Sequence, residues 1–437
     1  MVEIKWGAMN RVTNIAWRTA SGSRLGGFAY RYDALGRIVS RAHDLGGASF
    51  DRDYAYDDMD RLASDGGTAY AYDAAGNRMT RTEDGETVTY SLGAGDRLAA
   101  WTGGSYEYDG AGCVTRITRG ADTWDLTWNG QYQLVSVSTN GAFAEAYAYD
   151  ALGRRVTTRN AEGTERHVYD DNWQVVADLD ASGNVIRSYV WGEGIDRLLA
   201  VKIGSKTYTA LTDVQGTVWG YADEGGSVVA RWTYDAWGNA LTEEVDASAA
   251  ELRAVRYRFQ GREHSAVTGL TNFRMRWYDA VTGRWLSKDP IRLHGGINLY
   301  ACYGNSPLVG RDSFGLEPSD VDVSSVGYGV ENALESVLPE DALSAKGKSV
   351  VPATLGVAET AVQTMEALPN LGTVLRQAAD IQDEVDLFVS DPRQTVDSEN
   401  QIVGEVQKDF YKASRASENV AKKDVTPWWK GWFKGKK

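Results

Sequence analysis

A short repeated motif constrains this chain more than any other sequence feature. The motif reads Tyr-Asp, two variable residues and then Gly, and its clearest copies begin at Tyr32, Tyr72, Tyr108, Tyr149 and Tyr234. Weaker copies begin at Tyr56, Trp128 and Tyr169. The spacing varies around about twenty residues, which is typical of a repeat architecture in which each copy is one supersecondary unit.

Each copy predicts a β-hairpin. Upstream of the first Tyr, the aromatic residues Phe28 and Tyr30 alternate with Ala29 and Arg31, and this period of two residues is typical of a strand. The Asp of the motif can accept backbone N–H groups at the start of a turn, and the Gly supplies the positive φ that a tight turn requires. A single hairpin is not stable in water, so the repeats must pair with one another and bury an aromatic face.

The distribution of proline extends this prediction to a long region. All eight prolines lie at or after Pro290, whereas the preceding part is rich in Gly, Tyr, Trp and Thr. Proline cannot donate to a sheet ladder and is excluded from central strands. We therefore predict a mainly β fold in which a continuous antiparallel sheet covers residues 1–270.

Composition excludes several classes of protein. The net charge of −14 argues against a protein that coats nucleic acid. Only Cys113 and Cys302 are present, so neither a disulfide framework nor a zinc site is expected, and we predict no cofactor. The first residues lack a basic stretch followed by an apolar one, so no secretory signal is recognised. If the protein is secreted or displayed at the cell surface, we expect another export route, with a cytoplasmic stage before export.

The stretch from Asn272 to Leu316 differs from the repeats and resembles a known domain. Its sequence elements are RWYD at residues 276–279, GRW at 283–285, DPI at 289–291, GINLY at 296–300, GNSP at 304–307 and DSFGL at 312–316. In this order they resemble the core that ends the repeat region of RHS/YD-repeat proteins. That family includes bacterial polymorphic-toxin shells, the C component of Tc toxins and, more distantly, teneurins.

The resemblance covers residues 25–316 and implies a fold. In the family, the repeat strands spiral into a hollow shell that encloses a C-terminal segment, and the core closes the shell. We therefore expect a spiralling antiparallel sheet over residues 1–270 and an RHS core over residues 271–316. Because the repeat region is short for a complete enclosure, a partial shell or a fragment of a longer ancestral protein is the expectation.

The resemblance also implies chemistry. In the family, the core is a self-cleaving aspartyl protease that cuts after the closing Gly-Leu, which places the scissile bond at Leu316–Glu317. The matching catalytic residues are Asp289, Asp312 and Arg276. Two such carboxylates can act as an ionised base that activates water and a neutral acid that protonates the amide carbonyl, and an arginine can hold one of them ionised.

Simpler roles remain open for the same residues. Asp-Pro and Asp-Ser are ordinary turn openers, and Arg276 could simply pair with Asp279. The family usually has Pro where this chain has Ser313, in the turn that would present the bond. We therefore leave open whether the core is an enzyme that acts on its own chain.

The remaining residues, 317–437, have a different composition. Apolar residues in stretches such as 358–368 recur at the spacing of amphipathic helices, so this segment is predicted to be mainly helical. It contains no His or Cys, which excludes histidine-dependent nucleases and cysteine nucleophiles. Its last residues interleave Trp with Lys, as in stretches that bind membrane interfaces, although a solvated tail or a docking strip fits equally well.

Three functional hypotheses follow. In the first, the shell encloses or carries residues 317–437 as an effector and releases it by autoproteolysis, in interbacterial competition or toxin delivery; an immunity protein and a secretion-system component are the other expected partners. In the second, the sheet is a non-enzymatic scaffold that binds carbohydrate or a partner. In the third, the chain is a displaced RHS cassette. Aromatic side chains facing outward would favour the second hypothesis.

Overall fold

The computed structural model describes residues 2–7, 10–19, 21–316 and 319–320 of the 437. The chain divides into two compact units, Met1–Leu371 and Gly372–Lys437, and every described residue belongs to the first. The predicted helices of the C-terminal segment and its Trp/Lys-rich end lie outside the described residues. Among the residues that are described, no helix has the length and apolar character needed to span a bilayer.

A ladder of 24 strands dominates this unit. In chain order the strands are β1 (Val2–Trp6), β2 (Val12–Arg18), β3 (Arg24–Tyr32), β4 (Ile38–Leu45), β5 (Ala48–Tyr56), β6 (Leu62–Asp65), β7 (Thr68–Tyr72), β8 (Arg78–Glu83), β9 (Glu86–Leu92), β10 (Leu98–Trp101), β11 (Gly104–Tyr108), β12 (Val114–Arg119), β13 (Asp122–Trp128), β14 (Leu134–Thr139), β15 (Ala142–Tyr149), β16 (Arg155–Asn160), β17 (Gly163–Tyr169), β18 (Val175–Leu179), β19 (Val185–Trp191), β20 (Leu198–Ile203), β21 (Lys206–Thr212), β22 (Val218–Ala222), β23 (Val228–Tyr234) and β24 (Ala240–Val245).

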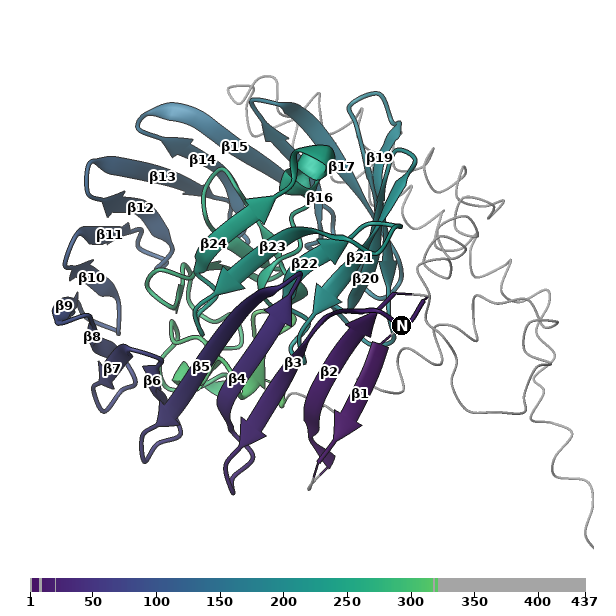
Figure 1. The fold of residues 1–437 in the computed structure, drawn as a ribbon. Helices are drawn as coiled ribbons and strands as arrows, with labels where there is room; N and C mark the ends of the chain where they lie inside the picture. Colours follow the sequence, from purple (N-terminus) through teal and green to yellow (C-terminus); the bar gives the residue numbers. More distant parts are fainter. Residues whose placement is uncertain (1, 8–9, 20, 317–318, 321–437) are drawn as a thin grey trace, which may run out of the picture. The chain divides into compact units, whose positions relative to one another are not determined.

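Each strand pairs antiparallel with the next one in sequence, from β1–β2 through to β23–β24. Figure 1 shows the resulting meander, whose hairpins fan around the green C-terminal part of the described chain. Within the described residues, β1 pairs only with β2 and β24 only with β23. The predicted long antiparallel sheet is therefore present, and each motif copy forms about one hairpin.

The turns at one end of the strands share a form that also occurs after β18 and β22. After each odd-numbered strand from β3 to β23, the chain makes a longer turn that begins at or near the motif Asp; we call these the YD turns. In the first of them, Asp33 Oδ1 accepts the N–H groups of Leu35 at 3.0 Å and Arg37 at 2.9 Å, and Gly36 has a φ of 81°. The predicted turn chemistry of Asp and Gly is confirmed here.

The motif Tyr also has a defined role. Tyr32 half-buries its ring beside Tyr30, and its hydroxyl donates a hydrogen bond to the carbonyl oxygen of Val12, the first residue of the preceding strand, at 2.7 Å. Equivalent bonds from the last residue of a strand to the first residue of the preceding strand are made by Tyr56, Tyr72, Trp128, Tyr149, Tyr169, Trp191 and Tyr234. Each bond supports the sheet across two strands.

The first and last parts of the ladder pack face to face. The indole of Trp219 on β22 lies 5.9 Å from the ring of Phe28 on β3 and 4.4 Å from that of His43 on β4. The hydroxyl of Tyr30 accepts the N–H of Val214 at 3.3 Å. Phe28 and Tyr30 are buried while Ala29 and Arg31 are exposed, which confirms the predicted alternation.

The chain after the ladder forms a small second sheet and short helices. Its elements are the 3₁₀ helices η2 (Ala247–Ala254), η3 (Phe259–Gly261), η4 (Arg292–His294) and η5 (Tyr303–Asn305), and the strands β25 (Glu263–His264), β26 (Thr271–Phe273), β27 (Arg276–Asp279), β28 (Arg284–Trp285), β29 (Gly310–Arg311) and β30 (Ser319–Asp320). An aromatic cluster with Phe273, Tyr278, Trp285 and Tyr303 fills it. We call residues 256–316 the closing segment.

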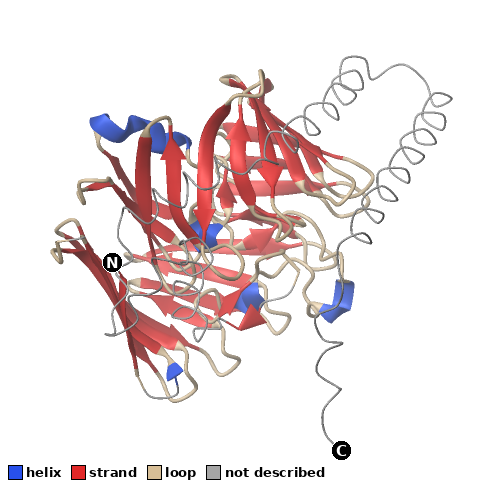
Figure 2. Ribbon diagram, turned by 90° about the vertical axis from the view of Figure 1, so that its right-hand side faces the viewer, coloured by secondary structure: helices blue, strands red, loops and turns tan. Residues whose placement is uncertain are grey.

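The ladder ends before the predicted domain boundary. Its last strand, β24, stops at Val245, and the boundary expected at residues 270/271 falls between β25 and β26 of the small sheet. The signal that set the prediction was the end of the repeats, which does not mark where the closing segment begins to pack. Figure 2 shows that strands dominate the described part of the chain, with a few short helices and loops between them.

Candidate active site

The three residues that the resemblance singles out lie together in the closing segment. Arg276 begins β27, and its guanidinium lies 4.3 Å from the ring centre of Trp285 on the paired strand β28. Its Nη1 lies 2.9 Å from Asp289 Oδ2 and its Nη2 lies 3.5 Å from Asp312 Oδ2. The guanidinium thus bridges two carboxylates that are 23 residues apart, and all three side chains are at most 5% exposed.

The expected scissile bond begins at the same place. The N–H of Leu316 donates to Asp312 Oδ1 at 2.9 Å, and Arg276 Nε donates to the carbonyl oxygen of Gly315. Gly315 has a φ of 69°, and a Cβ at this position would lie 2.8 Å from the carbonyl oxygen of Phe273. A glycine is therefore required for the closing residues to pass between β26 and Arg276. Glu317 lies outside the described residues.

Gly295 brings a second loop against this bond. A Cβ on Gly295 would lie 2.5 Å from Asp289 Oδ2 and 3.0 Å from the carbonyl oxygen of Leu316, so these two oxygens face the same small space. Asp289 itself is fixed by its Oδ1, which accepts the N–H of Ile291 at 2.9 Å. Nothing in the sequence indicated that Gly295 touches the site.

Burial and charge set the electrostatics of the site. Burial raises the pKa of Asp312 above its ordinary value, although the N–H of Leu316 and the charge of Arg276 oppose this. Burial lowers the pKa of Arg276, and the charges of Asp289 and Asp312 oppose that change. The guanidinium of Arg276 lies closer to Asp289 than to Asp312.

The structure excludes the simpler partner that the sequence allowed for Arg276. Asp279 ends the same strand, but its Oδ2 accepts hydrogen bonds from Arg119 and from the hydroxyl of Tyr106. Asp279 therefore ties β27 to strands β11 and β12 of the ladder. Asp279 thus attaches the closing segment to the ladder, whereas Asp289 and Asp312 lie beside its last residues.

The closing segment lies against the YD turns. The side chain of Asn305 donates to the carbonyl oxygen of Gly76 at 2.7 Å, the hydroxyl of Tyr300 to that of Gly112 at 2.8 Å, and the hydroxyl of Tyr278 to that of Trp237 at 2.8 Å. Further contacts to these turns come from Arg284 to Asp96, Arg274 to Trp173 and Asp196, and Pro307 to Gln215. The turns of one end of the ladder therefore position the site.

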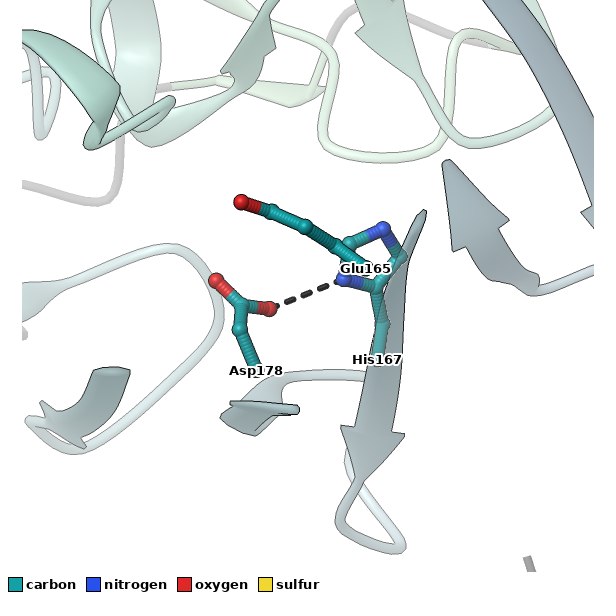
Figure 3. A group of neighbouring side chains, drawn as sticks. All are labelled: Glu165, His167 and Asp178. Carbon is teal, nitrogen blue, oxygen red and sulfur yellow. Dashed lines mark hydrogen bonds and ion pairs between the residues drawn. The ribbon is translucent and has the colours of Figure 1, made fainter. Parts of the chain in front are cut away.

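A second cluster of ionisable side chains has the spacing of metal ligands. Glu165, His167 and Asp178 offer ligand atoms within 4.8 Å of one another, and Figure 3 shows Asp178 bonded to the imidazole. However, the two oxygens of Asp178 already accept from Arg256 at 2.6 and 2.8 Å, and Arg187 donates to both Asp178 and Glu165.

Two guanidinium groups beside these ligand atoms would repel a metal ion, so the cluster does not suit one. Burial lowers the pKa of His167, which is therefore neutral at pH 7. The nearby stretch 178–183, which mimics a calcium loop, forms a hairpin turn in which Asp180 Oδ1 accepts the N–H groups of Ser182 and Asn184.

Comparisons with known proteins place this fold in a family. The family model of the teneurin YD-shell matches residues 2–307 of this chain. The chain is 29% identical over 331 residues to the double-stranded DNA deaminase toxin A of Burkholderia cenocepacia (strain H111), which covers 68% of this chain and 21% of that protein. It is 31% identical over 197 residues to the tRNA nuclease WapA of Bacillus subtilis (strain 168), which covers 43% of this chain and 8% of that protein.

A solved structure gives the same result for the fold. The structure of the Photorhabdus luminescens Tc holotoxin pore with a mutated TccC3 matches with a TM-score of 0.61 at 20% identity, covering 74% of this chain and 18% of that one. The chain thus spans less than a quarter of the length of each of these relatives. Since the family description covers well over half of its residues, the chain belongs to the teneurin YD-shell family.

Proposed function

We propose that this chain is a toxin-associated shell that carries residues 317–437 as cargo and detaches them by cutting its own Leu316–Glu317 bond. One observation carries the proposal: Arg276 bridges Asp289 and Asp312 beside Leu316, whose N–H is held by Asp312. The names of two relatives, a deaminase toxin and a nuclease, support a role in delivering effectors. Delivery outside the producing cell, an immunity protein and an export partner belong to the same proposal.

The arrangement supports an aspartyl mechanism. Asp289, held ionised by Arg276, takes a proton from a water molecule, and the resulting hydroxide adds to the carbonyl carbon of Leu316. Asp312 gives its proton to the carbonyl oxygen. When the tetrahedral intermediate collapses, the C–N bond breaks, the nitrogen of Glu317 receives the proton from Asp289, and the reformed carbonyl group returns its proton to Asp312. The products together contain one water more than the intact chain.

The raised pKa of Asp312 predicts how the rate depends on pH. A general acid acts only in its protonated form, and burial extends that form of Asp312 to a higher pH than usual. The rate of cutting is therefore expected to increase as the pH is lowered from 8 to mildly acidic values. Time courses of freshly translated chain at several pH values measure this, and a rate that rises with pH would contradict the role of Asp312 as the acid.

The first test is the intact mass of the purified protein under denaturing conditions. The proposal predicts two species that divide at Leu316–Glu317 and together equal the full chain plus one water. The substitutions Asp289→Asn and Asp312→Asn should each leave a single chain, because each removes a proton donor or acceptor while keeping the shape of the side chain.

A matched control separates chemistry from folding. Asp235 is a half-buried turn aspartate outside the site, and its side chain accepts N–H groups from Trp237 and Asn239. Asp235→Asn should still be cut. If Asp289→Asn is cut as fully as the parent, the aspartyl mechanism is wrong; if Asp235→Asn is also uncut, the losses reflect folding.

The scaffold hypothesis receives less support. It requires aromatic side chains on the outside of the sheet, but among the described residues the exposed aromatic ones are Trp6, Tyr132 and Phe143. Most of the others pack between strands or against the closing segment, as Tyr147 does against Trp277 with ring centres 4.8 Å apart. The packing therefore favours a shell organised around its closing segment.

A further inference from the structure

Two neighbouring YD turns place a non-glycine residue with a positive φ against the closing segment. The residue before the last position of each YD turn has a positive φ. In six of the eleven turns it is glycine, namely Gly36, Gly76, Gly112, Gly153, Gly216 and Gly238, and in three others it is Asp60, Asp96 or Tyr132. In the turn between β17 and β18 it is Trp173, with a φ of 63°, and in the turn between β19 and β20 it is Asp196, also with a φ of 63°. L-residues rarely adopt this conformation, and a bulky tryptophan is among the least suited to it.

Trp173 contacts the residue three positions before the expected cut. Its indole lies edge-on to the ring of Phe314, with ring centres 5.7 Å apart. On the same ring, the guanidinium of Arg274 lies 4.9 Å from the centre. Arg274 also donates to the carbonyl oxygens of Trp173, at 3.2 Å, and of Ser313. The ring of Phe314 therefore contacts both the indole of Trp173 and the guanidinium of Arg274. The same arginine also bonds the backbone of the ladder turn at Trp173 and that of the residue before Phe314.

Asp196 fixes the arginines that make this arrangement. It is 1% exposed and lies 2.8 Å from Arg274 Nη2 and 2.6 Å from Arg262 Nη1. Arg311, in the strand just before Asp312, lies 3.9 Å from its Oδ2. One buried carboxylate on a ladder turn thus anchors three arginines of the closing segment, two of which adjoin the residues that lead to Leu316.

We propose that Trp173, Arg274 and Asp196 form a binding subsite for the side chain of Phe314, and that this aromatic subsite positions Leu316 between Asp289 and Asp312. The inference rests on the proposed self-cleavage and adds its substrate specificity. The self-cleavage would require an aromatic residue three positions before the cut, and a turn of the ladder would bind that residue. Trp173, Arg274 and Asp196 are positioning residues, since their contacts are to residues 311–314 and not to the bond.

The sharpest variant is Trp173→Gly, because glycine is the residue that other YD turns place at this φ. The turn should be preserved while the aromatic wall of the subsite is removed. Aromatic pairs contribute enough that their loss slows a positioned reaction by roughly three- to tenfold. The measurement is a time course of full-length chain made in a cell-free translation reaction, with the cut fraction read by intact mass. Trp173→Tyr keeps an aromatic wall and should cut at a rate near that of the parent.

The matched control is Tyr132→Gly. Tyr132 is the other aromatic residue at a positive φ in a YD turn, with a φ of 62°, but it belongs to the turn between β13 and β14 and is 55% exposed. The proposal predicts that Tyr132→Gly cuts at the parent rate. If Trp173→Gly also cuts at the parent rate while Asp289→Asn blocks cutting, the subsite is wrong and the proposed self-cleavage stands.

A second measurement judges the subsite even if the parent chain is uncut. In the Asp289→Asn chain, brief chymotrypsin treatment should leave the bond after Phe314 protected, since its ring packs against Trp173 and Arg274. Adding Trp173→Gly should expose it at least several-fold, detected as a fragment that ends at residue 314. Equal cleavage after Phe314 in both chains would overturn the subsite. An uncut parent would overturn only the proposed self-cleavage.

Discussion

The ladder and the closing segment are stabilised in different ways. In the ladder, the defining contacts are local. The Asp of a turn accepts N–H groups two and four residues ahead, and the hydroxyl of the motif Tyr donates to the first residue of the preceding strand. In the closing segment, buried charges join residues far apart in sequence, such as Arg155 with Glu263 at 2.5 Å and Arg119 with Asp279. The ladder repeats the same turn and Tyr hydrogen bonds in many hairpins, whereas each buried ion pair of the closing segment occurs once.

This difference indicates where the fold is vulnerable. A local turn contact that is lost can be replaced by water, because most turn side chains are partly exposed. A buried charge that loses its partner has no such replacement and carries its full desolvation cost. Substitutions of similar chemistry should therefore have unequal effects in the two regions. The following expectations are for urea unfolding of the Asp289→Asn chain, which keeps every sample a single intact species.

The largest effect is expected for Glu263→Ala. This carboxylate accepts from Arg155 at 2.5 Å and from Arg256 at 2.6 Å, and it is 4% exposed. Removing it leaves two buried guanidinium groups without this partner, so the free energy of unfolding should fall by about 3–5 kcal/mol. A loss below about 1 kcal/mol would show that the closing segment is no more sensitive than the ladder.

Acid should weaken the closing segment through Asp196. Its arginine partners lower the pKa of this carboxyl to about 2, against the opposing effect of burial. A depressed pKa stabilises the fold above the unfolded value of about 4 and loses that contribution as the pH falls to about 2. Asp196→Asn should therefore cost about 2 kcal/mol at pH 5 and progressively less towards pH 2. A difference that does not change with pH would contradict the charge-based contribution of Asp196.

A turn substitution in the ladder should have a smaller effect. Asp33→Ala removes the acceptor for two N–H groups and the 2.6 Å contact with Arg37 Nε, but the site is partly open to water. The expected loss is about 1 kcal/mol, the usual value for a capping side chain. Asp33→Asn retains one acceptor oxygen and should lose less. A loss for Asp33→Ala equal to that for Glu263→Ala would remove the distinction between the regions.

The smallest effect is expected on the exposed face of the ladder. Arg31 and Asp53 form an ion pair at 2.9 Å, but their side chains are 71% and 76% exposed. Water and salt screen such pairs, so Arg31→Ala should change the free energy of unfolding by less than about 0.5 kcal/mol. A larger change would mean that cross-strand charges on the exposed face contribute as much as the turns.

The ladder could be predicted from the sequence because its information is local. The alternation of Phe28 and Tyr30, the turn Asp33 and the left-handed Gly36 are each visible within a few residues. The end of the ladder at Val245 could not be read in this way, since the chain after it still contains strand-like stretches and its packing depends on distant partners. Predictions for residues 317–437 concern a part of the chain that the structure does not describe, apart from β30.

The candidate site was predicted only through resemblance. Spacing alone cannot show that Arg276 meets Asp289 and Asp312 rather than Asp279, since these pairings depend on how β27 and the last residues fold back. The contributions of Trp173 and Asp196 were missed, although a signal existed: both occupy turn positions where the motif usually has glycine. The exposed Tyr132 occupies the same position, so a departure from glycine does not by itself identify a contact outside the repeat.

The contacts between the closing segment and particular YD turns fix how many hairpins can lie between those turns. Asn305 meets the turn at Gly76, Tyr300 the turn at Gly112, and Tyr278 the turn at Trp237, so successive parts of one short segment match turns several repeats apart. Inserting or deleting a whole hairpin between these turns would keep every local rule of the ladder and still bring the wrong turns to the segment. The closing segment therefore requires a fixed number of hairpins between the turns at Gly76 and Trp237, and hairpins could be added or removed without disturbing these contacts only outside that range.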